Sequence, residues 1–349
     1  MTAIRQKLLG WYDDAARDLP WRQTRDPYAI WVSEVMLQQT RVETVIPYYR
    51  RFLESFPTPS ALAAADEDAV LSHWSGLGYY RRARLLHAGV REVVAQYGGA
   101  VPRDADARRA LPGVGRYTAG AIGSIAFDKE EPIVDGNVTR VLARVFRIDT
   151  PVGTSATSKR LWNEAARLVP GARPGAFNQA LMELGATVCT PKQPRCHACP
   201  VSADCKAYAS GEVDSLPVPR ARKSPTEMKL AAVVATRGRG SDRQLWLVRS
   251  EQSLFGGLWG LPMIEREASD RSNAREALRE AGISARLDAE PKGRVEHVLT
   301  HRRLRVDLFR ATAAKGEESK NRRRFTTAEL ASVGISRLTK KILAAALGG

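Results

Sequence analysis

The stretch that decides the fold is CTPKQPRCHACPVSADC, residues 189–205. It holds all four cysteines of the 349-residue chain, at Cys189, Cys196, Cys199 and Cys205. Four thiolates this close in sequence can hold a tetrahedral zinc ion or a cubane iron–sulfur cluster. Zinc ribbons usually present two Cys-x2-Cys pairs, and this stretch has only one. The clustering therefore predicts a metal centre rather than unrelated buried thiols or two disulfides.

Working outward, the charge of the whole chain indicates a polyanionic partner. The formal net charge is +16 and the sequence pI is about 10.0, which favours DNA or RNA, although an arginine-rich proteome would give the same excess. No apolar run approaches the roughly 20 residues that span a bilayer, and the N-terminus has no signal-peptide core. We therefore expect an intracellular protein without membrane contact, in a bacterial cytoplasm and associated with the nucleoid. We also expect a monomer.

The texture of the sequence changes once along the chain, which predicts two domains. Residues 1–210 repeat apolar side chains at helical spacing, residues 211–228 read as a linker, and residues 229–349 read as a smaller α+β domain. In this second domain we expect strands over 230–236, 244–249, 294–301 and 304–311, and helices over 272–281 and 336–347.

A glycine-rich turn, Leu111-Pro-Gly-Val-Gly-Arg-Tyr, opens an apolar helix over 119–126. Gly113 and Gly115 permit close backbone approach, and the helix N-terminus offers unpaired amides to an anion. The turn has the signature of a helix-hairpin-helix motif, which grips the phosphate backbone without reading the bases. An ordinary turn between helices is the alternative.

Glu34 lies on a helix between apolar residues. One turn away on either side are Ile30, Trp31, Leu37 and Gln38. Partial desolvation of this kind raises a carboxyl pKa and suits a proton donor. Periodicity alone favours an ion pair with Arg22 or Arg41 instead.

Asp135 precedes a second apolar helix, over 138–146, and is well placed as its N-cap. Helix amides that bind the carboxylate should keep it ionised. One carboxyl group with a raised pKa and one ionised group are the pair that glycosidases use.

Taken together, these motifs resemble the endonuclease III superfamily of helix-hairpin-helix iron–sulfur glycosylases, and most closely its MutY-type adenine glycosylases. The resemblance is carried by the 6-2-5 cysteine spacing, the Leu111 turn, the segment Trp31–Thr40 and the segment Ile133–Arg140. It implies an all-α glycosylase domain in which the four cysteines hold a [4Fe–4S] cluster with a structural, DNA-positioning role. Lys192 and Arg195 would then face a DNA phosphate.

The resemblance also assigns site residues. Glu34 would protonate adenine, and Asp135 would stabilise or trap the oxocarbenium ion, with Asn137 and Tyr117 as their partners. Bifunctional members carry a lysine where this chain has Tyr117, so a monofunctional enzyme is implied. Residues implied to bind DNA are Arg22, Gln38, Gln39, Thr40, Tyr79, Leu111, Gly113, Gly115, Thr300 and His301. Gln38, Gln39 and Thr40 are expected to continue the helix of Glu34.

The second domain resembles a Nudix domain through Gly256-Gly-Leu-Trp-Gly-Leu-Pro262. A partial hydrolase box follows, formed by Glu267, Arg275, Glu276, Glu280 and Gly282. The box is incomplete because Arg279 replaces a metal-binding glutamate, so we expect a reader rather than a Mg²⁺-dependent hydrolase. The segment Leu299-Thr300-His301 matches a family loop that senses 8-oxoguanine, with leucine in place of phenylalanine.

The predicted function is hydrolysis of the N-glycosidic bond of adenine mispaired with 8-oxoguanine or guanine in double-stranded DNA. Three alternatives remain open: a glycosylase–lyase for oxidised pyrimidines, a non-catalytic iron–sulfur DNA-binding protein, and an active Nudix hydrolase.

Overall fold

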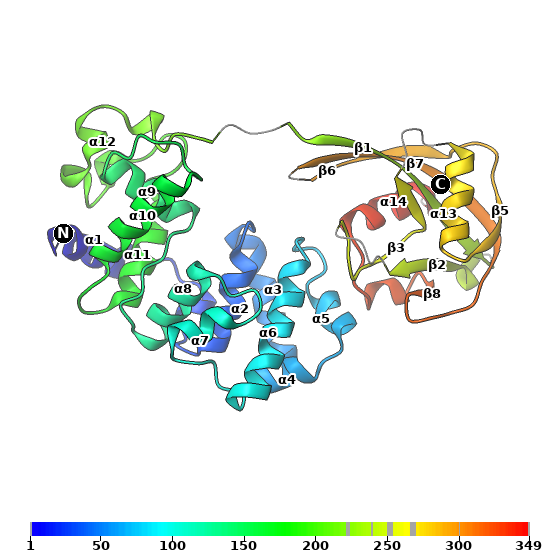
Figure 1. The fold of residues 1–349 in the computed structure, drawn as a ribbon, viewed down its shortest axis with the longest axis horizontal. Helices are drawn as coiled ribbons and strands as arrows, with labels where there is room; N and C mark the ends of the chain where they lie inside the picture. The colour runs from blue at the N-terminus through cyan, green and yellow to red at the C-terminus, as the bar shows by residue number, and fades with distance from the viewer. Residues whose placement is uncertain are drawn as a thin grey trace. The chain divides into compact units, whose positions relative to one another are not determined.

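The computed structural model describes residues 2–220, 224–238, 240–249, 254–265, 270–299 and 301–347. The chain divides into two compact units (Figure 1). The first comprises Met1–Ala64 and Leu85–Ala221, and the second comprises Ala65–Arg84 and Arg222–Gly349. All strands among the described residues belong to the second unit, so the predicted order of a helical domain followed by an α+β domain is confirmed.

The first unit consists of helices and short 3-10 turns. Its α-helices are α1 (Thr2–Ala15), α2 (Pro27–Leu37), α3 (Val42–Ser55), α4 (Pro59–Ala64), most of α6 (Arg81–Tyr97), α7 (Ala105–Ala110), α8 (Arg116–Phe127), α9 (Gly136–Val145), α10 (Ser155–Leu168), α11 (Pro174–Thr187) and α12 (Lys206–Ala209). Its 3-10 turns are η1 (Pro20–Arg22), η2 (Cys196–Ala198), η3 (Ser202–Asp204) and η4 (Val213–Ser215). In the described part of the chain, no helix has the length and apolar character needed to cross a membrane.

The centre of this unit is formed by α2, α8, α9 and α11. On α9, Val138, Val141, Leu142 and Val145 recur at helical spacing and are all buried. They share one core with Phe177, Leu181 and Leu184 of α11. Because α8 also contacts both α2 and α11, the starts of α8 and α9 are held beside the middle of α2.

Helix α2 ends at Leu37, which corrects the expectation that Gln38, Gln39 and Thr40 continue it. Gln39 has a φ of 56°, a left-handed conformation that an α-helix cannot contain. The chain turns here, and the Thr40 amide donates to the Leu37 carbonyl at 3.2 Å. These polar side chains therefore lie on a turn at the end of α2.

The predicted linker, residues 211–228, is shorter in the structure. Leu216 is 4% exposed, and the Val152 amide donates to the Val218 carbonyl at 2.9 Å. These contacts attach the segment through Val218 to the first unit. At its other end, strand β1 begins at Thr226.

The second unit is built on one sheet. Its strands are β1 (Thr226–Arg237), β2 (Gln244–Arg249), β3 (Trp259–Gly260), β4 (Met263–Glu265), β5 (Ser284–Leu287), β6 (Gly293–Val298), β7 (Arg302–Lys315) and β8 (Arg322–Thr326). Its α-helices are α5 (Glu67–His73), the first residues of α6, α13 (Arg271–Glu280) and α14 (Arg337–Leu347), and its 3-10 turns are η5 (Gly240–Asp242) and η6 (Glu329–Ala331). The central pair, β1 and β7, is parallel, with Thr226 opposite Arg302.

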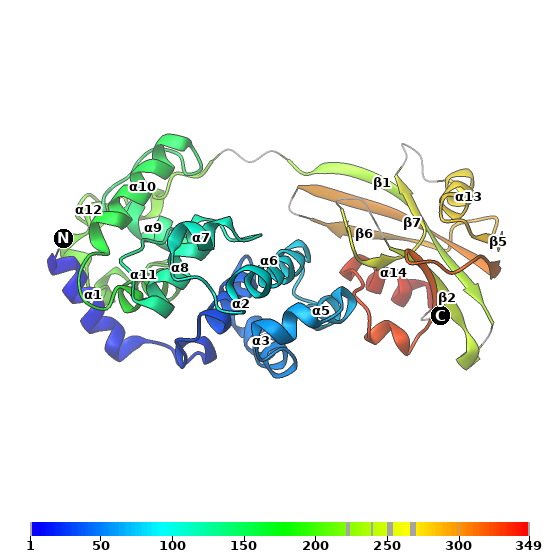
Figure 2. The same ribbon diagram turned by 60° about the horizontal axis from the view of Figure 1, so that its bottom comes forward.

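Side-chain alternation along β1 creates two cores, one on each face of the sheet. Leu230, Ala232 and Val234 pack with α14, whereas Ala231, Val233 and Ala235 pack with α13. Figures 1 and 2 show α13 and α14 beside these long strands. A sheet covered on both faces gives β1 its nearly continuous apolar sequence.

Both helices predicted after residue 229 are present, with α13 and α14 shifted by about one residue. The strand predicted over 294–301 ends at Val298, because the chain turns back there: the Leu299 amide donates to the Arg302 carbonyl at 2.8 Å. Strands β3, β4, β5 and β8 were not predicted. They have two to five residues each, too few for an alternating pattern to appear.

The segment 65–84 belongs to the second unit, whereas the sequence predicted one continuous domain over 1–210. Asp68 of α5 forms an ion pair with Arg249 of β2. The Tyr80 hydroxyl donates to the Ile335 carbonyl at 3.1 Å. Long-range contacts of this kind leave no signal in the local sequence pattern.

Candidate active site

Glu34 lies on a helix that runs through the protein interior. Asp26 caps α2 by accepting from the Tyr28 and Ala29 amides, and Pro27 occupies the first turn. Every residue of α2 from Tyr28 to Met36 is buried. Glu34 is 4% exposed, and burial raises its pKa to about 7, against the opposing effect of the Tyr117 hydrogen bond. The expected desolvation of this carboxyl group is therefore present.

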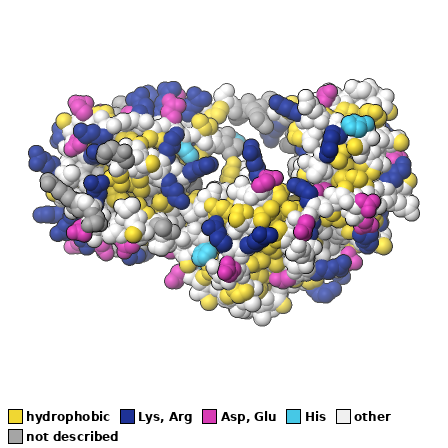
Figure 3. Space-filling model, turned by 180° about the vertical axis from the view of Figure 1, so that it is seen from behind, with side chains coloured by type: hydrophobic (Ala, Val, Ile, Leu, Met, Phe, Trp, Pro, Cys, Tyr) yellow, Lys and Arg dark blue, Asp and Glu magenta, His cyan; other side chains and the backbone are white. Residues whose placement is uncertain are grey.

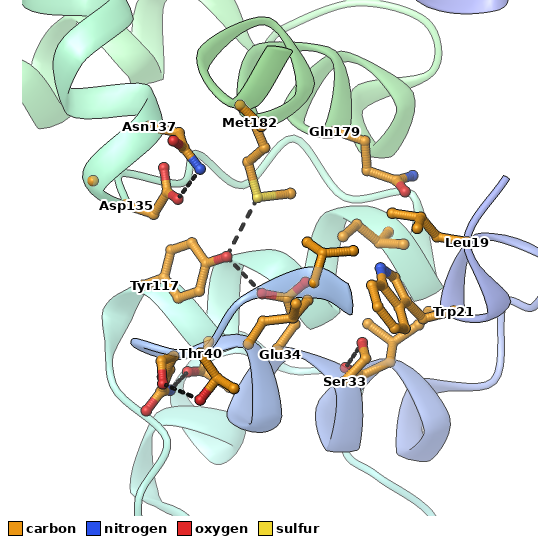
Figure 4. Close-up of a pocket in the computed structure, with 18 of the residues that line it drawn as sticks. Leu19, Trp21, Ser33, Glu34, Thr40, Tyr117, Asp135, Asn137, Gln179 and Met182 are labelled. Atoms are coloured by element: carbon orange, nitrogen blue, oxygen red, sulfur yellow. Dashed lines mark hydrogen bonds between the residues drawn. The ribbon is translucent and has the colours of Figure 1, made fainter. Parts of the chain in front are cut away.

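A cavity of about 690 Å³ opens beside Glu34. It brings together ten of the residues that the sequence singled out: Arg22, Glu34, Gln38, Gln39, Thr40, Gly113, Gly115, Tyr117, Asp135 and Asn137. Figure 4 shows the Tyr117 hydroxyl between Glu34 and Met182, with Asp135 and Asn137 to the left of Met182 and Trp21 on the right. Both carboxyl groups of the predicted pair therefore line the same space.

Tyr117, near the start of α8, contacts Glu34 directly. Its hydroxyl donates to Oε2 of Glu34 at 2.5 Å and lies 3.3 Å from Sδ of Met182. Burial and the nearby carboxyl groups raise the pKa of Tyr117 well above its usual value, so the hydroxyl keeps its proton. Tyr117 is therefore a hydrogen-bond donor to the carboxyl group.

Asp135 is the N-cap of α9, as predicted. Its Oδ1 accepts from the Val138 amide at 2.7 Å, and its Oδ2 accepts from Nδ2 of Asn137 at 3.3 Å. Burial is the largest influence and raises the pKa of Asp135, although these donors act in the opposite direction. Desolvation therefore outweighs the helix amides here, and the expectation that those amides keep Asp135 ionised stays a prediction.

Hydrogen bonds connect Asp135 with the cysteine segment. Nη2 of Arg140 donates to Oδ1 of Asn137 at 2.8 Å, and its Nε donates to the Cys189 carbonyl at 2.7 Å. Gly185 permits this close packing, since a Cβ there would lie 2.6 Å from Cβ of Asn137. Asn137 is thus held by a group that also holds the first cysteine.

A second buried glutamate on the cavity wall, Glu183 of α11, was missed by the sequence reasoning. It is 1% exposed and accepts from Nε of Arg17 at 2.7 Å and from Nη2 of Arg22 at 2.7 Å. Burial alone would raise its pKa, but the two guanidinium groups together lower it to about 2. The signal was available, because Glu183 interrupts an apolar helix just as Glu34 does. Arg22 pairs with Glu183, so the ion pair considered for Arg22 and Glu34 does not form.

The glycine turn comes just before α8, and its Gly113 and Gly115 line the cavity. Gly113 has a φ of 77°, and a Cβ there would lie 2.6 Å from Cβ of Leu85, so this position requires glycine. Gly115 caps α8 without a side-chain bond. Leu111 is 2% exposed, so its buried side chain anchors the turn in the protein interior.

The four cysteines surround one small cavity of about 20 Å³. In the described residues, no three His, Cys, Asp or Glu side chains are placed to hold a single metal ion. Arg144 is 2% exposed and donates to Sγ of Cys189 at 3.3 Å and to the Thr190 carbonyl at 2.8 Å. Four soft sulfur donors around a common space, with a buried cation beside one of them, suit a cluster of metal and sulfide.

The remaining predicted residues lie in the second unit or on the surface. Tyr79 is 49% exposed with a φ of 49°. His301 is exposed on the turn between β6 and β7, and Thr300 lies outside the described residues. Lys192 is exposed, and Arg195 donates to the Thr187 carbonyl at 2.8 Å. Lys and Arg side chains are spread over the visible surface in Figure 3.

The incomplete hydrolase box lies on and before α13. Glu280 lines a separate cavity of about 770 Å³ in the second unit. Arg279, which replaces a glutamate, is exposed and lies 3.4 Å from Glu276. Glu267, the first box residue considered, lies outside the described residues.

Comparisons with known proteins match both units. Residues 32–167 match the family model of the HhH-GPD superfamily base excision DNA repair protein, and residues 232–345 match that of the NUDIX domain. The chain is 42% identical to the adenine DNA glycosylase of Rattus norvegicus, over 88% of this chain and 70% of that protein. It is 39% identical to the Mus musculus enzyme, over 98% of this chain and 77% of that protein. Identity to the Homo sapiens enzyme is 40%, over 88% and 67%.

Solved structures agree on the fold of the helical part. A thermostable thymine-DNA glycosylase superposes with a TM-score of 0.54 at 32% identity, covering 60% of this chain and 96% of that one. A trapped endonuclease III–DNA covalent intermediate gives a TM-score of 0.51 at 24% identity, covering 59% and 94%. The second of these likenesses concerns the fold alone.

Proposed function

This chain belongs to the adenine DNA glycosylase family, and on that premise we propose that it removes adenine paired with 8-oxoguanine or guanine. As a family member it is a DNA glycosylase of base excision repair. The proposal adds the opposing base and the residues that carry the reaction. Glu34 is the general acid, and Asp135 stabilises or traps the oxocarbenium ion.

One observation carries the proposal: the buried carboxyl group of Glu34 and the half-buried carboxyl group of Asp135 line the same cavity. The pKa of Glu34 is raised to about 7, so near neutrality it carries a proton that it can give up. Adenine is a poor leaving group as an anion, and a proton at its N7 removes that difficulty. As the bond between N9 and C1′ breaks, positive charge develops on the sugar, and an ionised Asp135 stabilises that charge.

The other residues then have supporting roles. Tyr117 fixes the orientation of the Glu34 carboxyl group, and Asn137 fixes that of Asp135. Water adds at C1′, directly or after Asp135 has formed a covalent ester. The product is free adenine and an abasic site.

The strand stays intact in this mechanism. The described residues that line the cavity include no lysine, and Tyr117 stands where bifunctional relatives carry the amine. Without an amine no Schiff base forms with the sugar, so the backbone is not cleaved. This is why we prefer a monofunctional enzyme to a glycosylase–lyase.

The proposed substrate is double-stranded DNA, bound by one copy of the chain, since a single chain supplies all of the cavity. Gly113, Gly115 and the start of α8 would hold a phosphate. Gln38, Gln39, Thr40 and Tyr79 would contact the opened base pair. Thr300 and His301 would read the opposing base.

The four cysteines fit a [4Fe–4S] cluster by their number, their sulfur chemistry and the common space they enclose. When bound, such a cluster would fix the 189–205 segment, which has little core of its own, and no step of the proposed hydrolysis needs its electrons. Cys189, Cys196, Cys199 and Cys205 would hold it.

The test is release of adenine from duplexes that carry 8-oxoguanine or guanine opposite adenine, under single turnover. We expect Glu34→Gln to slow release by roughly 10³-fold, because it removes the proton donor but keeps the shape. Glu43→Gln, an exposed glutamate on α3, is the matched control and should leave the rate unchanged. Undiminished release by Glu34→Gln would contradict the proposal, as would a stable DNA adduct after borohydride.

A further inference from the structure

The Tyr117 hydroxyl lies between two acceptors. Oε2 of Glu34 is 2.5 Å away and Sδ of Met182 is 3.3 Å away, as the dashed lines in Figure 4 show. A hydroxyl group has one hydrogen, so the two acceptors compete for it. Met182 belongs to α11 and is half-buried on the cavity wall.

The outcome of this competition depends on whether Glu34 carries its proton. An ionised carboxylate is a much stronger acceptor than a thioether, so it takes the Tyr117 hydrogen. A neutral carboxyl group accepts weakly, and the hydrogen can then turn towards sulfur. Oε1 of Glu34 has no hydrogen-bond partner among the described residues, so a proton held there is free to meet a substrate.

From this geometry, and resting on the function proposed above, we propose that Met182 is a positioning residue for the acid. Its thioether accepts the Tyr117 hydrogen while Glu34 is neutral, which favours the state in which Glu34 holds the proton it will donate. No proton changes residue in this step, since only the Tyr117 hydroxyl rotates. After Glu34 has given its proton to adenine, the hydroxyl turns back to the new carboxylate.

Five other charged groups line the cavity, and none of them is a hydrogen-bond partner of Glu34 in the described part of the chain. They are Arg17, Arg22 of η1, Arg116 of α8, Asp135 at the start of α9 and Glu183 of α11. Arg17 and Arg22 are both bound to Glu183. Asp135 favours the neutral form of Glu34 by its negative charge, and Arg22 favours the ionised form by its positive charge. Tyr117 is the only described side chain that donates a hydrogen bond to Glu34.

A thioether is suited to this position because it is a weak acceptor. Leucine at the position keeps the volume but cannot accept, so Tyr117 would donate to Glu34 in both states. That would favour the ionised form of Glu34 and lower its pKa. Glutamine has about the length of methionine and accepts more strongly, so it should act in the opposite direction to leucine.

The experiment measures single-turnover adenine release against pH for the wild type, Met182→Leu and Met182→Gln. The rate of the wild type should fall as pH rises through the pKa of Glu34, because the acid is lost. We expect Met182→Leu to move this fall to lower pH by about 0.5 unit and to leave the low-pH rate unchanged. In Met182→Gln the fall in rate should occur at the same pH as in the wild type or at a higher pH. Met228→Leu, a buried methionine of the second unit, is the matched control and should not move it.

A second readout needs no catalysis. Infrared titration of the free protein follows the neutral carboxyl band that disappears in Glu34→Gln, and Met182→Leu should shift its midpoint by the same amount. A uniform loss of rate at every pH, with an unmoved midpoint, would mean that Met182 only packs, and would overturn the proposal. If the wild type released no adenine while the infrared midpoint still shifted, the proposed function would fail and the role of Met182 would stand.

Discussion

Two buried glutamates face the same cavity and have opposite chemistry. Glu34 is 4% exposed and Glu183 is 1% exposed, so burial alone would raise the pKa of both. Glu34 has a neutral hydroxyl as its partner, and its pKa is raised to about 7. Glu183 has two guanidinium groups, and its pKa is lowered to about 2.

The partners of a buried carboxyl group therefore decide what it can do. Paired with Arg17 and Arg22, Glu183 stays ionised and joins three chain segments. Without a cation, Glu34 can exchange a proton near neutrality. Both sit on helices of similar apolar character, so helix sequence alone does not separate a structural carboxylate from an acid.

The largest effect that would sharpen this comparison is expected for stability. Glu183→Gln should lower the free energy of unfolding by about 3 kcal/mol, because it leaves two partly buried guanidinium groups without their carboxylate. Glu34→Gln should not lower the free energy of unfolding at neutral pH, because the raised pKa of Glu34 means that its burial already costs the wild type stability there.

Urea unfolding at neutral pH measures both variants. Glu164→Gln is the matched control, because Glu164 pairs with the exposed Arg167 one turn along α10 and its replacement should cost less than about 1 kcal/mol. Equal losses for Glu183→Gln and Glu34→Gln would break the comparison.

The two glutamates should also give opposite dependences of stability on pH. The pKa of Glu34 is raised in the folded state, from 4.5 to about 7, so its burial costs stability increasingly as pH rises across that window. The pKa of Glu183 is lowered, from 4.5 to about 2, so its contribution is present above 4.5 and is lost as pH falls towards 2. Each shift corresponds to about 3 kcal/mol.

The measurement is the difference in unfolding free energy between wild type and each variant as a function of pH. The free energy of unfolding of Glu34→Gln should increase relative to that of the wild type as pH rises from 4.5 to 7. The free energy of unfolding of Glu183→Gln should increase relative to that of the wild type as pH falls from 4.5 to 2. A flat difference for either variant would show that its glutamate has an ordinary pKa in the folded protein.

The smallest effect is expected for a residue of the second unit. His301→Ala, on the turn between β6 and β7, should reduce the preference for 8-oxoguanine over guanine by about tenfold, the value of one polar contact. The rate opposite guanine and the position of the pH-dependent fall should stay as in the wild type. Rates with both opposing bases measure it, and an equal loss on both would remove His301 from the recognition of the lesion.

Much of the fold was accessible from the sequence because its signals are local. The 6-2-5 cysteine spacing, the Leu111 turn and the Asp135 cap each fall within a short window, and the change from helical to alternating patterns marks the second unit. Short strands such as β3 and β8, and the membership of residues 65–84 in the second unit, depend on contacts between distant segments. Local patterns cannot report these contacts.

Local sequence patterns were enough to find the residues that could do the chemistry: a glutamate on an apolar helix, an aspartate at a helix start, and a tyrosine in place of an amine. Their protonation states and partners depend on the three-dimensional packing. It placed Tyr117 against Glu34, paired Arg22 with Glu183 instead, and desolvated Asp135 enough to raise its pKa. The physical reason is that a pKa depends on desolvation and on charges within a few ångströms, and those neighbours come from helices far apart in the chain.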